Sequence, residues 1–166
     1  MNPRPLMVLR AIGLMIIALV LQTVVLNRFQ VFGVTASLVV VMVILMARWL
    51  DARAALLVGF TSGLVLDLLG ASPLGLRALV YTVVAFAAIR LTGDAPLRSL
   101  AGVWALSLLA EVLIFVLGTL AGQGSLLQAE VLTRAVVVPL LNLGLAAMLY
   151  PLLAKILAPT DRGALV

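Results

Sequence analysis

The chain has 166 residues, of which 65% are hydrophobic and only 10% are charged, with a net charge of +5. Soluble domains carry about 45–50% apolar and about 25% charged residues, and a soluble chain this short cannot bury so much apolar surface, so lipid must surround most of it. The lack of His and Cys excludes Ser-His triads, imidazole bases, disulfides and zinc-thiolate sites.

Six apolar segments have about the length that a transmembrane helix requires. A helix needs about 20 mostly apolar residues to cross a hydrocarbon core of about 30 Å. We therefore predict an all-α membrane protein, a six-transmembrane-helix bundle that forms a single integral membrane domain over residues 1–166. The predicted spans are 10–27, 31–47, 54–70, 77–92, 99–121 and 134–154.

The first predicted span also has features of a signal peptide. Arg4 and Arg10 precede an apolar run, as basic residues do in a secretory signal. The run is long for the apolar region of a signal peptide, and the one nearby small-x-small site, Val34-Thr35-Ala36, is weak. We therefore favour a retained helix.

Basic residues near the span ends predict the orientation of the chain. They occur singly between apolar runs without interleaved aromatics, which indicates membrane topology rather than nucleic-acid binding. Because cytoplasmic loops carry an excess of Lys and Arg, we predict that both termini lie in the cytoplasm. Eight basic residues fall on the cytoplasmic side (Arg4, Arg10, Arg48, Arg53, Arg90, Arg98, Lys155 and Arg162) and three on the other (Arg28, Arg77 and Arg134).

Four predicted spans contain a polar side chain at a similar height. At 1.5 Å of rise per residue, Gln22, Asp67, Glu111 and Asn142 all lie about 18–20 Å from the cytoplasmic edge. Polar groups at this depth are costly and need a partner. We favour a hydrogen-bond network that fixes helix packing, and the alternative is a pocket that opens outward or an interface for a partner helix.

Asp67 shares one helix face with glycines. Gly59, Gly63 and Asp67 are four residues apart and Gly70 follows three later, so they line one side of a helix. The Gly59–Gly63 pair is a small-xxx-small pattern that lets another backbone approach closely. We favour contact with a helix of the same chain over contact with another protein.

A tight turn follows this helix. Pro73 fixes φ and Gly75 permits positive φ, so the segment between the third and fourth spans is a short turn. We expect Asp67 to orient this turn, and its possible charge partners are Arg77 and Arg134.

The sequence lacks the common catalytic motifs. Neither GxxxxGK[ST] nor GxGxxG occurs, and neither Asp67 nor Glu111 has a nearby nucleophile motif or a dense metal-ligand cluster. We predict a protein that is not an enzyme and that holds no cofactor or metal.

The third span and the turn after it resemble a known family. Residues 59–69 read GFTSGLVLDLL and residues 73–76 read PLGL. This stretch resembles the bacterial rod-shape-determining protein MreD family, which shows GFxxGLxxDLL, a PLG turn and then an apolar span with an aromatic, here Tyr81 and Phe86. Residues 139–142 and 150–151 resemble the last helix of the family more weakly.

The resemblance implies a function. It implies a non-enzymatic scaffold of the cell-elongation (rod) complex, or elongasome, in the bacterial inner membrane, which supports peptidoglycan synthesis. The implied partner is the bitopic protein MreC and, through it, MreB, RodA and its transpeptidase partner. The family fold is likened to the substrate-binding component of energy-coupling-factor transporters, so the alternative function is to bind a vitamin or metal for a separate ATPase module.

Overall fold

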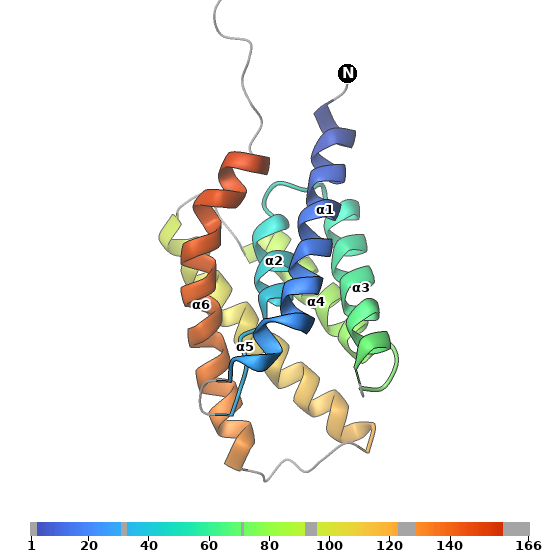
Figure 1. The fold of residues 1–166 in the computed structure, drawn as a ribbon, viewed down its shortest axis with the longest axis vertical. Helices are drawn as coiled ribbons and strands as arrows, with labels where there is room; N and C mark the ends of the chain where they lie inside the picture. The colour runs from blue at the N-terminus through green and yellow to red at the C-terminus, as the bar shows by residue number, and fades with distance from the viewer. Residues whose placement is uncertain (1–2, 31–32, 71, 92–95, 123–128, 158–166) are drawn as a thin grey trace, which may run out of the picture.

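The structure is a computed structural model, which describes residues 3–30, 33–70, 72–91, 96–122 and 129–157. Within these residues the chain forms six α-helices and one short 3-10 helix, as Figure 1 shows. The first turn of α1 and the last turn of α6 lie at the same end of the bundle (Figure 1). In chain order the elements are α1 (Pro3–Val24), the 3-10 helix η1 (Leu26–Arg28), α2 (Leu38–Met46), α3 (Ala52–Leu69), α4 (Leu76–Leu91), α5 (Pro96–Leu120) and α6 (Ala129–Leu157).

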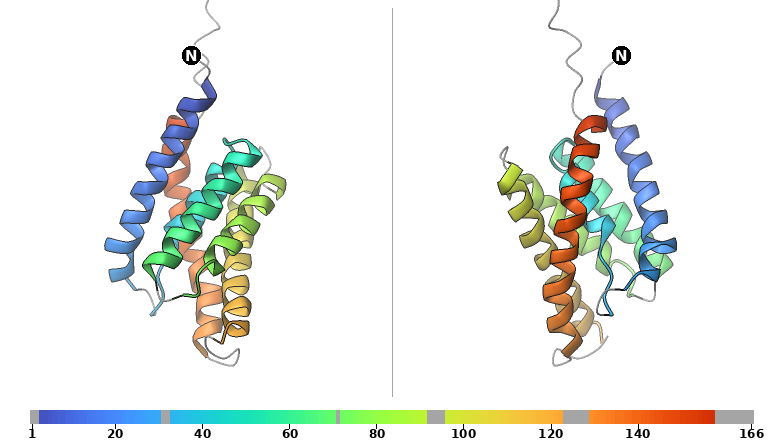
Figure 2. Two further views of the ribbon diagram at one scale, coloured as in Figure 1. Left: turned by 90° about the vertical axis from the view of Figure 1, so that its right-hand side faces the viewer. Right: turned by 60° about the vertical axis from the view of Figure 1, so that its left-hand side comes forward.

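The short helix α2 lies at the centre of the bundle. All nine of its residues are apolar and all are buried. It contacts all five of the other helices, which Figure 2 shows around it from two sides. A helix that is hydrophobic all round is either buried in a protein core or surrounded by lipid. The burial of every α2 residue and its contacts with the five other helices place it in the core.

Four helices are long and apolar enough to cross a membrane within the described residues: Leu6–Arg28, Ala52–Leu69, Leu100–Leu120 and Thr133–Leu157. The prediction of a complete second span at 31–47 is wrong, because α2 has nine residues and so is only about 14 Å long. The chain before it, at residues 33–37, is not helical. The helix α4 has 16 residues, so it is about 24 Å long.

The other predicted spans fall on helices, although the ends differ. The helix α3 begins two residues before the predicted span at 54–70. The helices α1 and α6 are longer than predicted, and Pro151 does not end α6. Residues 31–32 and 92 of the predicted spans lie outside the described residues, as do Arg162 and the side chains of Arg4 and Arg98.

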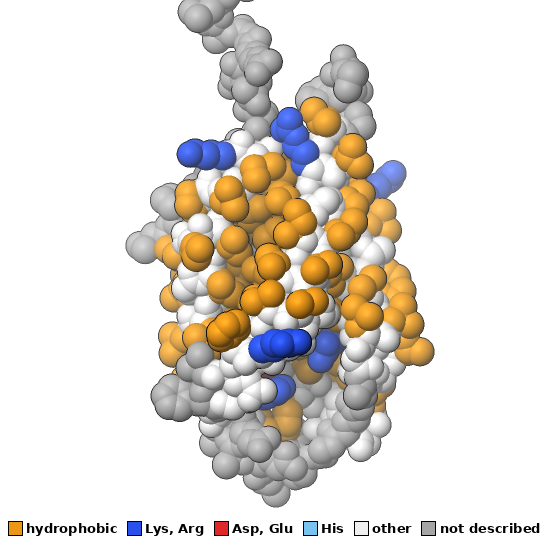
Figure 3. Space-filling model, in the orientation of Figure 1, with side chains coloured by type: hydrophobic (Ala, Val, Ile, Leu, Met, Phe, Trp, Pro, Cys, Tyr) orange, Lys and Arg blue, Asp and Glu red, His pale blue; other side chains and the backbone are white. Residues whose placement is uncertain are grey.

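The surface shows the pattern of a helix bundle in lipid. On the face in Figure 3, a broad band of hydrophobic side chains lies between two levels of Lys and Arg. At the end that holds the start of α1 and the end of α6, the Arg10 Nη1 atom donates a hydrogen bond of 3.1 Å to the Ile156 carbonyl. The last carbonyls of a helix have no partner within it, so Arg10 on α1 completes the end of α6.

Candidate functional site

Asp67 binds the start of the next helix. Its side chain is buried, and its Oδ1 atom accepts hydrogen bonds from Ser72 Oγ at 2.9 Å and from the Arg77 N–H at 3.2 Å. Its Oδ2 atom accepts from the N–H groups of Gly75, Arg77 and Ala78 at 3.0, 3.0 and 3.2 Å. The first N–H groups of a helix lack partners and carry partial positive charge, so a carboxylate satisfies and stabilises the start of α4.

The expected charge partner of Asp67 is therefore different in the structure. The sequence offers the guanidinium groups of Arg77 and Arg134 as partners, but in the structure Arg77 contributes its main-chain N–H. The reason is local geometry: the turn at Pro73 folds α4 back so that its first turn faces Asp67, and the Leu76 N–H closes the turn on the Pro73 carbonyl at 3.2 Å. Gly75 has a φ of +91°, which L side chains rarely adopt.

Gly59 and Gly63 lie where α3 meets α4. A Cβ atom added to Gly63 would lie 2.5 Å from the Arg77 carbonyl oxygen and 2.6 Å from the Ala78 Cα. One added to Gly59 would lie 2.7 Å from the Tyr81 carbonyl oxygen. Both would meet main chain, which cannot move as a side-chain tip can. The contact of this small-xxx-small pair is thus with a helix of the same chain.

Gly70 does not take a conformation that requires glycine. Its backbone is extended, with φ at −106° and ψ at −177°. An added Cβ would lie 3.0 Å from the Leu66 carbonyl oxygen, so a side chain at this position would require a small shift of its neighbour.

Gln22 on α1 and Asn142 on α6 bind the start of α2. Gln22 Oε1 accepts the Leu38 N–H at 2.7 Å and its Nε2 donates to the Ala36 carbonyl at 3.1 Å. Asn142 Oδ1 accepts the Ser37 N–H at 2.7 Å. Non-helical backbone at membrane depth is tolerated only where its polar groups find partners inside the protein or water. These two amides supply such partners, which explains how a nine-residue helix can begin inside the bundle.

Replacing Gln22 with leucine tests this arrangement. The change removes the partners of the Leu38 N–H and the Ala36 carbonyl, so we expect it to lower the free energy of unfolding by about 2–4 kcal/mol. The measurement is the thermal unfolding midpoint of the purified chain in detergent. Gln30→Leu is the matched control, because Gln30 is exposed. Equal midpoints for the two variants would contradict the capping role of Gln22.

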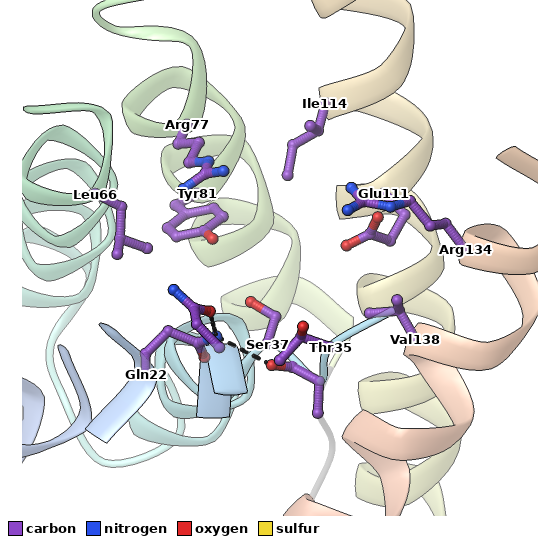
Figure 4. A pocket seen from close by; sticks show the side chains of 12 residues that line it. Gln22, Thr35, Ser37, Leu66, Arg77, Tyr81, Glu111, Ile114, Arg134 and Val138 are labelled. Carbon is purple, nitrogen blue, oxygen red and sulfur yellow. Dashed lines mark hydrogen bonds between the residues drawn. The ribbon is translucent and has the colours of Figure 1, made fainter. Parts of the chain in front are cut away.

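A cavity of about 170 Å³ lies beside Gln22, near the end of α1 and the start of α4. Figure 4 shows Arg77 and Tyr81 on α4, Glu111 on α5 and Arg134 on α6 around it, with Gln22 on the opposite wall. The complete lining is Gln22, Asn27, Thr35, Ala36, Ser37, Leu66, Arg77, Tyr81, Glu111, Ile114, Arg134 and Val138.

The four polar residues of the predicted layer thus divide into two groups. Gln22, Asp67 and Asn142 bind main chain at the starts of helices, and of these only Gln22 also lines the cavity. Glu111 faces the cavity. Reasoning from the sequence missed Arg77, Tyr81 and Arg134 as lining residues. The position of both arginines near the predicted outer edge could have indicated that they lie close together. Within the described residues, no group of three or more acidic side chains could hold a metal ion.

The fold and these contacts define an all-helical membrane protein whose buried polar side chains mainly satisfy helix starts within the bundle. The family model described as rod shape-determining protein MreD matches residues 4–159, and the chain belongs to the MreD family. Membership implies a role in rod-shape determination, in a family of membrane proteins that is not a known enzyme family. No curated protein and no solved structure matches the chain, so neither the likeness to energy-coupling-factor components nor the transporter alternative gains support.

Proposed function

We propose that this protein is a non-enzymatic scaffold of the cell-elongation complex, which binds an MreC-like bitopic protein and supports peptidoglycan synthesis in a rod-shaped bacterium. In this proposal the chain is one integral domain that crosses the cytoplasmic membrane several times, with the start of α1 and the end of α6 in the cytoplasm. The observation that carries the proposal is the family match over residues 4–159.

The polar chemistry of the bundle supports a scaffold. The Asp67 carboxylate accepts hydrogen bonds from the start of α4, and the Gln22 and Asn142 side-chain amides accept hydrogen bonds from the start of α2. These groups hold helices in place and are not free to bind or transform a substrate. The orientation is supported by Arg10, Lys155 and the other basic residues of the predicted cytoplasmic side.

Affinity purification of the tagged chain from its own membranes tests the proposal. We expect an MreC-like bitopic protein to co-purify, because a scaffold must hold its partner through helix contacts in the bilayer. Depletion of the chain should turn rods into spheres, and expression of the unaltered chain from a second locus should restore them.

The control is an unrelated polytopic protein with the same tag, purified from the same cells, which should not recover the MreC-like partner. Rods that persist after depletion, or a chain that co-purifies with ATPase subunits and a bound vitamin but without the MreC-like protein, would overturn the proposal.

A further inference from the structure

Two cavities of different character adjoin each other at the end of the bundle where α1 ends and α4 begins. The polar cavity of about 170 Å³ is described above. The second, of about 280 Å³, lies between α5 and α6 and adds the apolar side chains of Val112, Phe115, Val131 and Ala135. The two share Glu111, Ile114 and Arg134 as a common wall. Together they form a site that is polar at one side and apolar at the other.

The charges on the polar side do not balance. Arg77 and Arg134 bring two positive charges and Glu111 brings one negative charge. Asp67 also lies nearby, but its carboxylate is held by the start of α4, whose partial positive charge it offsets. Within the described chain no hydrogen bond or ion pair joins the Arg77 or Arg134 guanidinium to another group. Among the described side chains that line the polar cavity, counted with Glu111 ionised, one positive charge is in excess, and a cation beside lipid is costly without an anion.

The shape of the two cavities selects the kind of anion. A small soluble anion would fill only the polar side and would leave the apolar groove between α5 and α6 without an occupant. A membrane lipid has both parts, a phosphodiester with one negative charge and a hydrocarbon chain. One phosphodiester also neutralises the one unbalanced positive charge, and the planar guanidinium group of Arg suits phosphate oxygens.

The position of the site suits a lipid headgroup. Gln22, on the wall of the polar cavity, lies in the last turn of α1. The helices α5 and α6 extend beyond the ends of α1 and α3 at this side (Figure 1). The polar cavity thus lies near the level where several helices end, and the groove runs along two helices that continue.

We propose that the paired cavities bind an anionic membrane phospholipid, with its phosphodiester between Arg77 and Arg134 and one hydrocarbon chain in the groove between α5 and α6. Glu111 then sets the net charge of the site, so that a singly charged headgroup is preferred. The lipid joins α4, α5 and α6 at the end of the bundle where the starts of α2 and α4 lie.

Native mass spectrometry of the full chain in detergent tests the lipid charge. Phosphatidylglycerol should bind about tenfold more tightly than phosphatidylcholine, because the choline cation of phosphatidylcholine offsets the charge of its phosphodiester beside two arginines, and the strength of one charge-assisted contact corresponds to about one order of magnitude in affinity. Diacylglycerol, which has no phosphate, should bind at least as weakly as phosphatidylcholine. Inorganic phosphate, added alone as a competitor, should not displace the bound phosphatidylglycerol.

Matched variants test each side of the site. Arg134→Gln and Arg77→Gln should each weaken phosphatidylglycerol binding about tenfold. Arg28→Gln should leave it unchanged, because Arg28 is exposed and lies outside the lining of the polar cavity. Ala135→Phe, which fills the apolar groove, should weaken binding of the long-chain lipid, whereas Val136→Phe should not, because the exposed Val136 lies outside the groove.

Several results would overturn the proposal. They are equal binding of phosphatidylglycerol and phosphatidylcholine, unchanged binding in the Arg134 and Ala135 variants, or displacement by inorganic phosphate, which would make this a small-anion site. Loss of an MreC-like partner from Arg134→Gln with unchanged lipid binding would indicate a protein carboxylate as the occupant. Lipid binding is measured on the chain alone, so its failure and the failure of the proposed scaffold function are distinguishable.

Discussion

Replacing Asp67 with alanine is expected to lower the free energy of unfolding by about 3–5 kcal/mol. The change leaves the Ser72 hydroxyl and the N–H groups of Gly75, Arg77 and Ala78 without their acceptor. Each buried polar group that loses its partner costs about 1–3 kcal/mol. The measurement is the unfolding midpoint in detergent, which should fall by about 6–12 °C or more.

Two further variants define the cause of this loss. Asp51→Ala is the matched control. Asp51 stands directly before α3, the helix that contains Asp67, and it is exposed and makes no capping hydrogen bond from its side chain. It should change the free energy of unfolding by less than about 0.5 kcal/mol. Asp67→Asn keeps one acceptor oxygen and should fall between the unaltered chain and Asp67→Ala. If Asp67→Ala and Asp51→Ala have the same unfolding midpoint, the conclusion that Asp67 stabilises the turn and the start of α4 is wrong.

Replacing Gly63 with alanine is expected to force α3 and α4 apart. The new Cβ would lie 2.5–2.6 Å from main-chain atoms of Arg77 and Ala78, so relief requires a shift of a whole helix. Overpacking of this kind costs about 1–3 kcal/mol, and main chain on the opposing side places the cost toward the upper end. The measurement is again the unfolding midpoint, together with the yield of monodisperse protein.

Gly144→Ala is the control for this second prediction. Gly144 lies in α6, and an added Cβ would have no atom within 4 Å, so only helix propensity changes. That change favours alanine by up to about 1 kcal/mol. The two substitutions are chemically identical, and opposite signs are expected. A Gly63 variant as stable as the Gly144 variant would contradict the close approach of α3 and α4.

The sequence was most informative where a pattern is local. High apolar content and few charges indicated an all-helical membrane protein, and the Gly59–Gly63 spacing indicated a close helix contact. The turn at Pro73 and Gly75 placed Asp67 near the start of the next helix. Each of these depends on residues close in sequence, so periodicity and turn chemistry are sufficient. The functional roles assigned to these residues stay predictions, which the substitutions at Gln22, Gly63 and Asp67 test.

The second span shows why the local pattern was not sufficient elsewhere. Residues 31–47 are apolar enough to be counted as a full span, yet only Leu38–Met46 is an α-helix. Composition cannot tell a lipid-facing helix from a short helix buried on every side. The start of α2 depends on amides from α1 and α6, and the Ser37–Asn142 bond joins residues 105 positions apart. No window of sequence contains that pair.

The sequence by itself determined that lipid surrounds this protein and that its fold is helical. It also identified the few polar residues within the spans that need partners, because each buried polar group in lipid needs one. Only the tertiary structure decided what those partners are. Gln22, Asp67 and Asn142 bind the starts of helices, whereas Glu111 meets Arg77 and Arg134 at a cavity. The physical reason is that hydrogen bonds depend on direction and distance, which the packing of separate helices sets, whereas burial in lipid depends mainly on composition.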